Sequence, residues 1–187
     1  GLRENLCPAV ISGFVDTLEL ETWGSEAADK LAEELGLSRM LGLLVQEAWA
    51  MGDAYCVVWP NRAGVDTPRF YKSAHMSPAV DPEDPSQLAH LVRRWIQPDG
   101  YGRATVYYPD RVERFVTVAK VVHPDVSGTP TWPGKPEGWA PFNGDGDPEV
   151  IGHNYGGVPG VWLKLDATDT EGYGTSILTD VIPLQDA

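Results

Sequence analysis

Residues 52–61 read Gly-Asp-Ala-Tyr-Cys-Val-Val-Trp-Pro-Asn, and the periodicity of the chain changes at this stretch. Before it, apolar residues recur every three or four positions, as they do on one face of a helix. Within it, residues 54–59 are rich in β-branched and aromatic side chains, which favours a strand, and residues 60–64 are typical of a turn. The sequence therefore predicts an α+β fold, in which an N-terminal helical lobe precedes a mainly antiparallel sheet.

The helical lobe is predicted over residues 1–52 and should hold three short helices. Pro8 suits the first position of a helix, and apolar residues follow it at helical spacing. Ser25 is expected to cap a second helix that ends at Gly36. Ser38 should cap a third, which ends at the glycine that opens the stretch quoted above.

The sheet region is predicted over residues 53–118. Residues 88–97 are expected to form a strand, with Leu91, Arg93 and Trp95 on one face and Val92, Arg94 and Ile96 on the other, and Asp99-Gly100 is a strong turn signal. Together with strands over 103–108 and 111–118, they predict a three-stranded antiparallel meander. Two shorter strands are expected before it, over residues 69–75 and 76–81.

Residues 119–150 contain six prolines and five glycines, which predicts a surface excursion and not a core element. Residues 151–187 should then supply a last strand, over 158–165, and the start of a helix capped by Thr175 or Ser176. The chain stops while the apolar stripe of this helix is still under way. We therefore expect the 187 residues to be an internal piece of a longer protein with a truncated C-terminal helix.

The composition excludes several classes of function. The chain carries a net charge of −13, so its surface repels phosphates and disfavours tight binding to nucleic acid or to an anionic membrane. It has no apolar run of about twenty residues that could span a membrane. Cys7 and Cys56 do not have the spacing of a metal site, and two cysteines without a signal peptide favour reduced thiols in the cytosol. Cys56 is expected to be a buried, inert thiol in its strand.

No motif points to catalysis, to a cofactor or to a metal, so the sequence predicts a protein that is not an enzyme. Asp145-Gly-Asp147 resembles part of a calcium loop but lacks the closing glutamate. The acidic side chains that follow residue 80 are expected to solvate a turn; they are Asp81, Glu83 and Asp84. The histidines are too far apart in sequence for a local metal motif and are expected to be surface or loop residues; they are His75, His90, His123 and His153.

Two groups of side chains leave alternatives open. Aromatic residues in and just after the excursion could form a sugar-binding platform, or could pin the loop to the domain or to another subunit; they are Trp132, Trp139, Phe142 and Tyr155. Five arginines lie in the meander, namely Arg93, Arg94, Arg103, Arg111 and Arg114. They could pair with Asp110 and Glu113 on the facing strands, or with acidic residues of another subunit.

Five segments occur in a fixed order along the chain: Asn5-Leu-Cys-Pro8, Gly52 to Asn61, Ala104 to Arg114, Gly157-Val-Pro159 and Gly174 to Ala187. In this order they resemble the portal proteins of tailed bacteriophages, in the branch common in phages and prophages of actinobacteria. The resemblance spans nearly the whole chain, although none of the five segments is diagnostic alone.

The resemblance implies a structural, homo-oligomeric ring, typically of twelve subunits, at one vertex of the capsid. It implies that the terminase packages double-stranded DNA through the ring, and that capsid or scaffold and tail adaptor proteins bind to it. The whole chain would be the wing domain, and its last helix would lead to a missing stem and clip. Because the residues that contact DNA are expected in those missing parts, none is assigned here. The resemblance places the protein in the virion, and in the host cytoplasm during assembly.

The residues alone leave two other functions open. One is a glycan-acting hydrolase, which would need two carboxyl groups roughly 5–10 Å apart across one cleft. The other is a carbohydrate-binding module, for which Trp132 and Trp139 would have to share one exposed plane.

Overall fold

The computed structural model describes residues 11, 24–121, 130–142, 149–165, 172–176 and 178. The chain folds as two compact units, one formed by Gly1–Ser73 with Gly160–Ala187 and the other by Ala74–Pro159. These breaks differ from the divisions at residues 52, 118 and 150 that the sequence suggested. That the whole chain forms one wing domain stays a prediction.

Two helices open the described part of the first unit: α2 (Glu26–Leu35) and α3 (Leu37–Met51). Ser25 caps α2, because its side chain accepts a hydrogen bond from the backbone N–H of Ala28. Gly36 ends α2 in the left-handed conformation, with φ of +65°, and α3 begins at the next residue. These two predicted helices are confirmed, but the predicted cap of α3 is wrong: Gly36 is its N-cap, and Ser38 lies inside the first turn. The first predicted helix lies outside the described residues, apart from Ile11, which is helical and buried.

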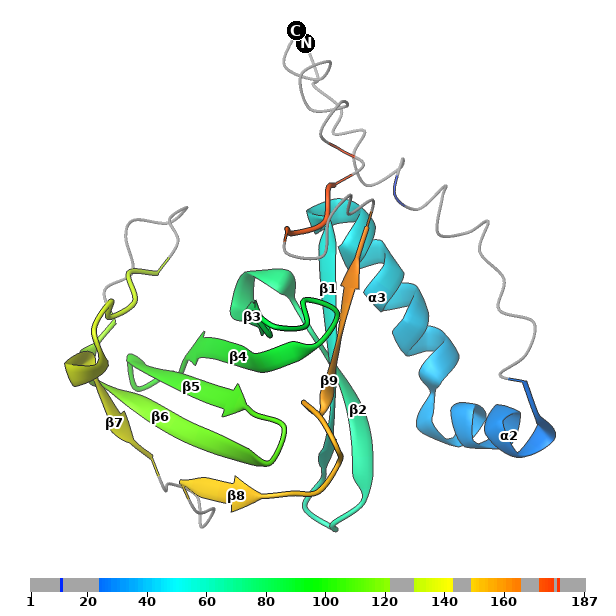
Figure 1. Ribbon diagram of the computed structural model, residues 1–187, viewed down its shortest axis with the longest axis horizontal. Helices are drawn as coiled ribbons and strands as arrows, with labels where there is room; N and C mark the ends of the chain where they lie inside the picture. Colours follow the sequence, from blue (N-terminus) through cyan, green and yellow to red (C-terminus); the bar gives the residue numbers. More distant parts are fainter. Residues whose placement is uncertain are drawn as a thin grey trace, which may run out of the picture. The chain divides into compact units, whose positions relative to one another are not determined.

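A three-stranded antiparallel sheet completes the first unit. Its strands are β1 (Asp53–Pro60), β2 (Asp66–Tyr71) and β9 (Gly160–Lys164), in the order β2-β1-β9. Helix α3 runs beside β1 and β9 (Figure 1). Leu44 and Ala48 of α3 pack against Ala54, whose side chain is fully buried. The core of this unit therefore lies between α3 and the central strand.

The second unit is an antiparallel sheet of six strands. They are β3 (Met76–Val80), β4 (Leu88–Ile96), β5 (Tyr101–Tyr107), β6 (Arg111–Lys120), β7 (Trp139–Pro141) and β8 (Val150–Gly152). The order is β3-β4-β5-β6-β7, and β8 also pairs with β6. The short 3-10 turns η1 (Ser73–His75) and η2 (Pro136–Gly138) precede β3 and β7. The predicted meander is confirmed as β4, β5 and β6, and the α+β class with it.

The structure corrects three of the expectations. The strands of residues 53–118 fall into two separate sheets, with β1 and β2 in one and β3 to β6 in the other, and β9 joins the first by pairing with β1. The strand expected over 69–75 runs from Asp66 to Tyr71. The excursion is more than a surface loop, since β7 and β8 satisfy the backbone groups along the edge of β6. Most of the predicted C-terminal helix, residues 177 and 179–187, lies outside the described residues.

Cys56 in β1 is half-buried, so it is less enclosed than expected. Burial raises the pKa of its thiol, and a hydrogen bond from the backbone of Arg69 offsets this in part. Since the thiolate is the reactive form, we expect Cys56 to react more slowly with Ellman's reagent at pH 8 than free cysteine does. The Cys7→Ser variant isolates its signal, and unfolding in guanidinium should remove the difference. A folded-state rate equal to that of free cysteine would contradict this.

Candidate functional site

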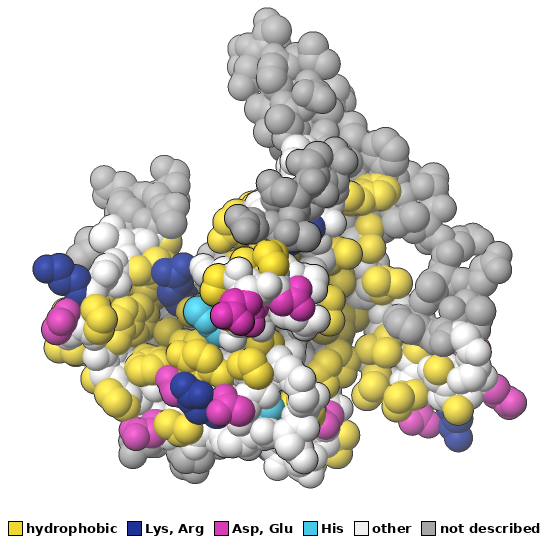
Figure 2. Space-filling view, viewed as in Figure 1, with side chains coloured by type: hydrophobic (Ala, Val, Ile, Leu, Met, Phe, Trp, Pro, Cys, Tyr) yellow, Lys and Arg dark blue, Asp and Glu magenta, His cyan; other side chains and the backbone are white. Residues whose placement is uncertain are grey.

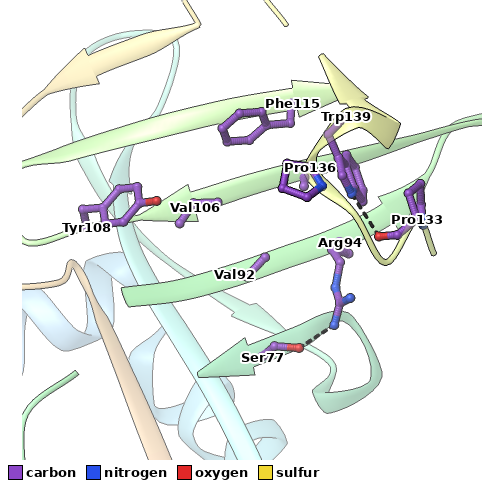
Figure 3. A pocket seen from close by; sticks show the side chains of 10 residues that line it. Ser77, Val92, Arg94, Val106, Tyr108, Phe115, Pro133, Pro136 and Trp139 are labelled. Carbon is purple, nitrogen blue, oxygen red and sulfur yellow. Dashed lines mark hydrogen bonds between the residues drawn. The ribbon is translucent and has the colours of Figure 1, made fainter. Parts of the chain in front are cut away.

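A cavity of about 500 Å³ lies on one face of the second sheet (Figure 3). Its floor follows from the strand register, since residues paired directly across antiparallel strands point to the same face. Val92 of β4 pairs with Val106 of β5, and Ala104 of β5 pairs with Phe115 of β6. All four side chains line the cavity. The opposite face holds Leu91, which is fully buried, so the cavity opens on the other side of the sheet.

The wall of the cavity comes from the proline-rich excursion. Pro133, Pro136 and Trp139 line it, and the indole N–H of Trp139 donates a hydrogen bond of 3.3 Å to the carbonyl of Pro133. Figure 3 shows this bond at the end of the cavity near η2. The rings of Trp132 and Trp139 stack with centroids 6.1 Å apart and planes 19° apart. The aromatic side chains also contact the sheet, since the Phe142 ring lies 4.5 Å from the guanidinium of Arg103 on β5. In the described residues they therefore hold the excursion against its own sheet.

Arg94 is the charged side chain of the cavity lining. Its guanidinium donates a hydrogen bond of 2.6 Å to the hydroxyl of Ser77 on β3, and lies 5.8 Å from the ring centroid of Trp132. Among the described residues, none that lines the cavity is a carboxylate. Figure 2 shows that hydrophobic side chains gather over this part of the sheet, with charged side chains bordering them. The cavity can accept an apolar group that carries a negative charge, but it offers no acid and base pair.

The candidate residues from the sequence do not converge on this cavity. Asp81 and Asp84 accept hydrogen bonds from the backbone N–H groups of Glu83 and Ser86, so these carboxylates shape a turn as expected. Of the arginines, Arg111 forms ion pairs of 3.0 Å with Asp110 and 2.6 Å with Glu113. These partners are its neighbours along the chain and do not lie on a facing strand, as the sequence had suggested.

The histidines of the described chain bind backbone carbonyls or stack on rings. His75 Nδ1 lies 3.1 Å from the carbonyl of Arg94, and His153 Nε2 lies 3.0 Å from that of Tyr108. The imidazole of His90 packs against the Tyr108 ring, at 5.6 Å between centroids. Among the described residues no group of three or more possible ligands could hold a metal ion. His123 and the pair Asp145 and Asp147 lie outside the described residues.

A second feature, the glycine crossing, lies in the first unit. It is the point at which residues 172–176 pass over Gly52, where α3 ends and β1 begins. The backbones touch: a Cβ atom added to Gly52 would lie 2.2 Å from the carbonyl oxygen of Gly174. Leu165 donates a backbone hydrogen bond of 2.8 Å to Gly52, and Thr175 donates one of 2.7 Å to Leu165. Only residues without a side chain can pass each other this closely.

Asp53 fastens the glycine crossing. Its side chain is buried, and its Oδ1 atom accepts hydrogen bonds from the indole N–H of Trp162, at 2.8 Å, and from the backbone N–H of Gly174, at 2.9 Å. Its carbonyl accepts a further bond from the hydroxyl of Ser73. Ser176 donates to the carbonyl of Ala50, at 2.6 Å. The segment that leaves β9 is thereby tied to the end of α3.

Tyr55 lies beside this network, with its ring 6.3 Å from that of Trp162 and only 1% of its surface exposed. Burial, and to a lesser degree the charge of Asp53, raise its pKa far above the ordinary value of 10. Above pH 10 the unfolded chain therefore loses a proton that the folded chain keeps. We expect the free energy of unfolding to fall there, by at most about 1.4 kcal/mol per pH unit. Urea titrations at pH 9, 10 and 11 should show a smaller fall for Tyr55→Phe, and equal falls would contradict this.

Sequence reasoning missed both the cavity and the role of Asp53. The alternation in β4 did place Val92 and Arg94 on one face, which was a usable signal for the cavity floor. An acidic residue at the start of an apolar strand, as at Asp53, was a second signal. The approach of Gly174 to Gly52 had no local signal at all.

In the described residues, the chain is an α+β protein with two antiparallel sheets. It has an apolar cavity lined in part by Arg94, and a glycine crossing held by Asp53. Among the described residues, no helix is both long and apolar enough to cross a membrane. In comparisons with known proteins, no family model matches the chain and no curated protein is significantly similar to it.

Proposed function

We propose that this chain is a structural part of a phage portal ring, in its wing region, and that its role is assembly and not catalysis. The glycine crossing is the observation that carries the proposal. Gly52 and Gly174 belong to two of the five segments on which the resemblance to portal proteins rests, and their backbones are in contact. The contact holds residues 172–176 against the end of α3, which supports a rigid structural role.

The acidic charge of the chain also supports a structural role. A net charge of −13 disfavours retention of DNA, so a duplex could pass the ring without adhering to this part. In this proposal the terminase, capsid or scaffold and tail adaptors are the protein partners, and the ring acts in the virion and in the host cytoplasm during assembly. Twelve copies are expected from the resemblance.

The glycan-acting alternatives draw less support from the described residues. A hydrolase needs paired carboxyl groups in a cleft, whereas none of the described residues that line the cavity is a carboxylate. A carbohydrate-binding platform needs Trp132 and Trp139 in one exposed plane, whereas the two rings are stacked on each other and half-buried.

Native mass spectrometry of the protein that contains this chain tests the proposal. Identical subunits that meet through unlike surfaces close into a ring of defined size. We therefore expect one dominant species whose mass is a fixed multiple, near twelve, of the subunit mass. A monomer or dimer at micromolar concentration would count against the proposal.

A further inference from the structure

We propose that the cavity of the second unit receives the exposed face of α2 from a neighbouring copy of this chain. The contact rests on the proposed ring, in which each copy presents unlike surfaces to its two neighbours. The contact joins two largely apolar surfaces that lie in different units. The cavity carries an arginine, and the helix carries acidic side chains.

The first surface is the cavity itself. Its volume of about 500 Å³ is enough for several side chains, and its floor and wall are apolar and aromatic. Arg94 has five N–H donors, and one of them bonds Ser77. In Figure 3 the Arg94 side chain extends beside the cavity toward Ser77. The guanidinium can therefore bind a carboxylate that arrives together with apolar side chains.

The second surface is the exposed stripe of α2, formed by Ala27, Leu31 and Glu34. These residues follow one another at spacings of four and three, so they share one face of the helix. All three are exposed, and 53% of the Leu31 surface is open to solvent. Within α2 only Ala32 is buried, so the helix gains little from its own unit. A ten-residue helix is marginal alone, and a partner on the Leu31 face would stabilise it.

Charge complementarity selects this occupant. Helix α2 carries four acidic side chains and one lysine, a net charge of −3. The described part of the cavity lining contains Arg94 and no acidic side chain. Figure 2 shows hydrophobic and acidic side chains together over α2. With Leu31 inserted in the cavity, Glu34 one turn later is placed to meet Arg94, in the manner of an amphipathic helix bound in a groove.

A charge exchange between copies tests the contact. At rising concentration the 187-residue chain should show an average mass above that of the monomer in sedimentation velocity. Arg94→Glu alone and Glu34→Arg alone should each weaken association about tenfold or more, since each places like charges opposite each other. An equimolar mixture of the two variants should regain association, because each cavity then faces a helix of opposite charge. Only a contact between copies can be rescued in this way.

Leu31→Asp should likewise weaken association, whereas Leu43→Asp on α3 serves as the matched control. Leu43 is a leucine of similar exposure, at 44%, outside the α2 stripe. Equal weakening by both would overturn the proposal.

Three further outcomes would overturn the contact. They are a wild-type chain that stays monomeric at millimolar concentration, an undiminished association of Arg94→Glu, and a mixture that associates no better than either variant. If the protein containing this chain still forms rings, only this contact fails. If the charge exchange succeeds and no ring forms, the contact stands and the portal function fails.

Discussion

Replacing Gly52 with alanine is expected to lower the free energy of unfolding by about 3–5 kcal/mol. Two physical effects add here. Gly52 has φ of +87°, which an alanine adopts only under strain, and the new Cβ atom would lie 2.2 Å from the carbonyl oxygen of Gly174. The atoms nearest to the new Cβ atom are backbone atoms of Gly174 and Thr175, so no side chain can rotate to relieve the clash. Urea unfolding followed by far-UV circular dichroism measures the change.

Gly64→Ala is the matched control for this substitution. Gly64 also has a positive φ, of +76°, but nothing lies within 4 Å of its added Cβ atom. It should therefore cost only the conformational strain, about 1 kcal/mol. Equal losses for Gly52→Ala and Gly64→Ala would show that the backbones at the crossing do not touch in solution.

Replacing Asp53 with alanine is expected to cost about 2–4 kcal/mol. The change removes the acceptor shared by the indole N–H of Trp162 and the backbone N–H of Gly174. Each donor that loses its partner away from water costs roughly 1–3 kcal/mol. Residues 172–176 should also loosen from the end of α3. Urea unfolding gives the free energy, and the fluorescence of Trp162 should shift to the red as its indole gains water.

Asp53→Asn is the control for this effect. An asparagine keeps one side-chain oxygen in place of Oδ1, so the two donors can retain an acceptor and the loss should stay near 1 kcal/mol. If Asp53→Asn and Asp53→Ala destabilise the protein equally, the negative charge would matter more than the hydrogen bonds. If neither does, Asp53 does not fasten the crossing.

Local features of the fold could be predicted because local chemistry determines them. Ser25 caps α2 and Gly36 ends it, and the turn at Asp99-Gly100 joins β4 to β5, as the residue types indicate. Each of these features depends on residues within a few positions of one another. Periodicity and turn propensity report on that range.

Features that join distant segments could not be predicted. The pairing of β9 with β1 brings Val161 opposite Cys56, and no pattern in either strand specifies the other. The same limit applies to Gly174, whose partner lies at the end of a helix far upstream. The cavity forms because Trp139 of the excursion lies against the same face of the sheet as Val92 and Val106. The proline-rich sequence of the excursion does not predict that part of it pairs with the edge of β6. Tertiary packing decides all of these features.

The proposed portal function requires that the protein assembles into a ring. Negative-stain electron microscopy of the protein that contains this chain, with class averages viewed down the particle axis, tests this requirement. We expect closed rings with a central hole and one dominant number of subunits. Uniform small particles at micromolar concentration, with no ring in any class, would contradict it.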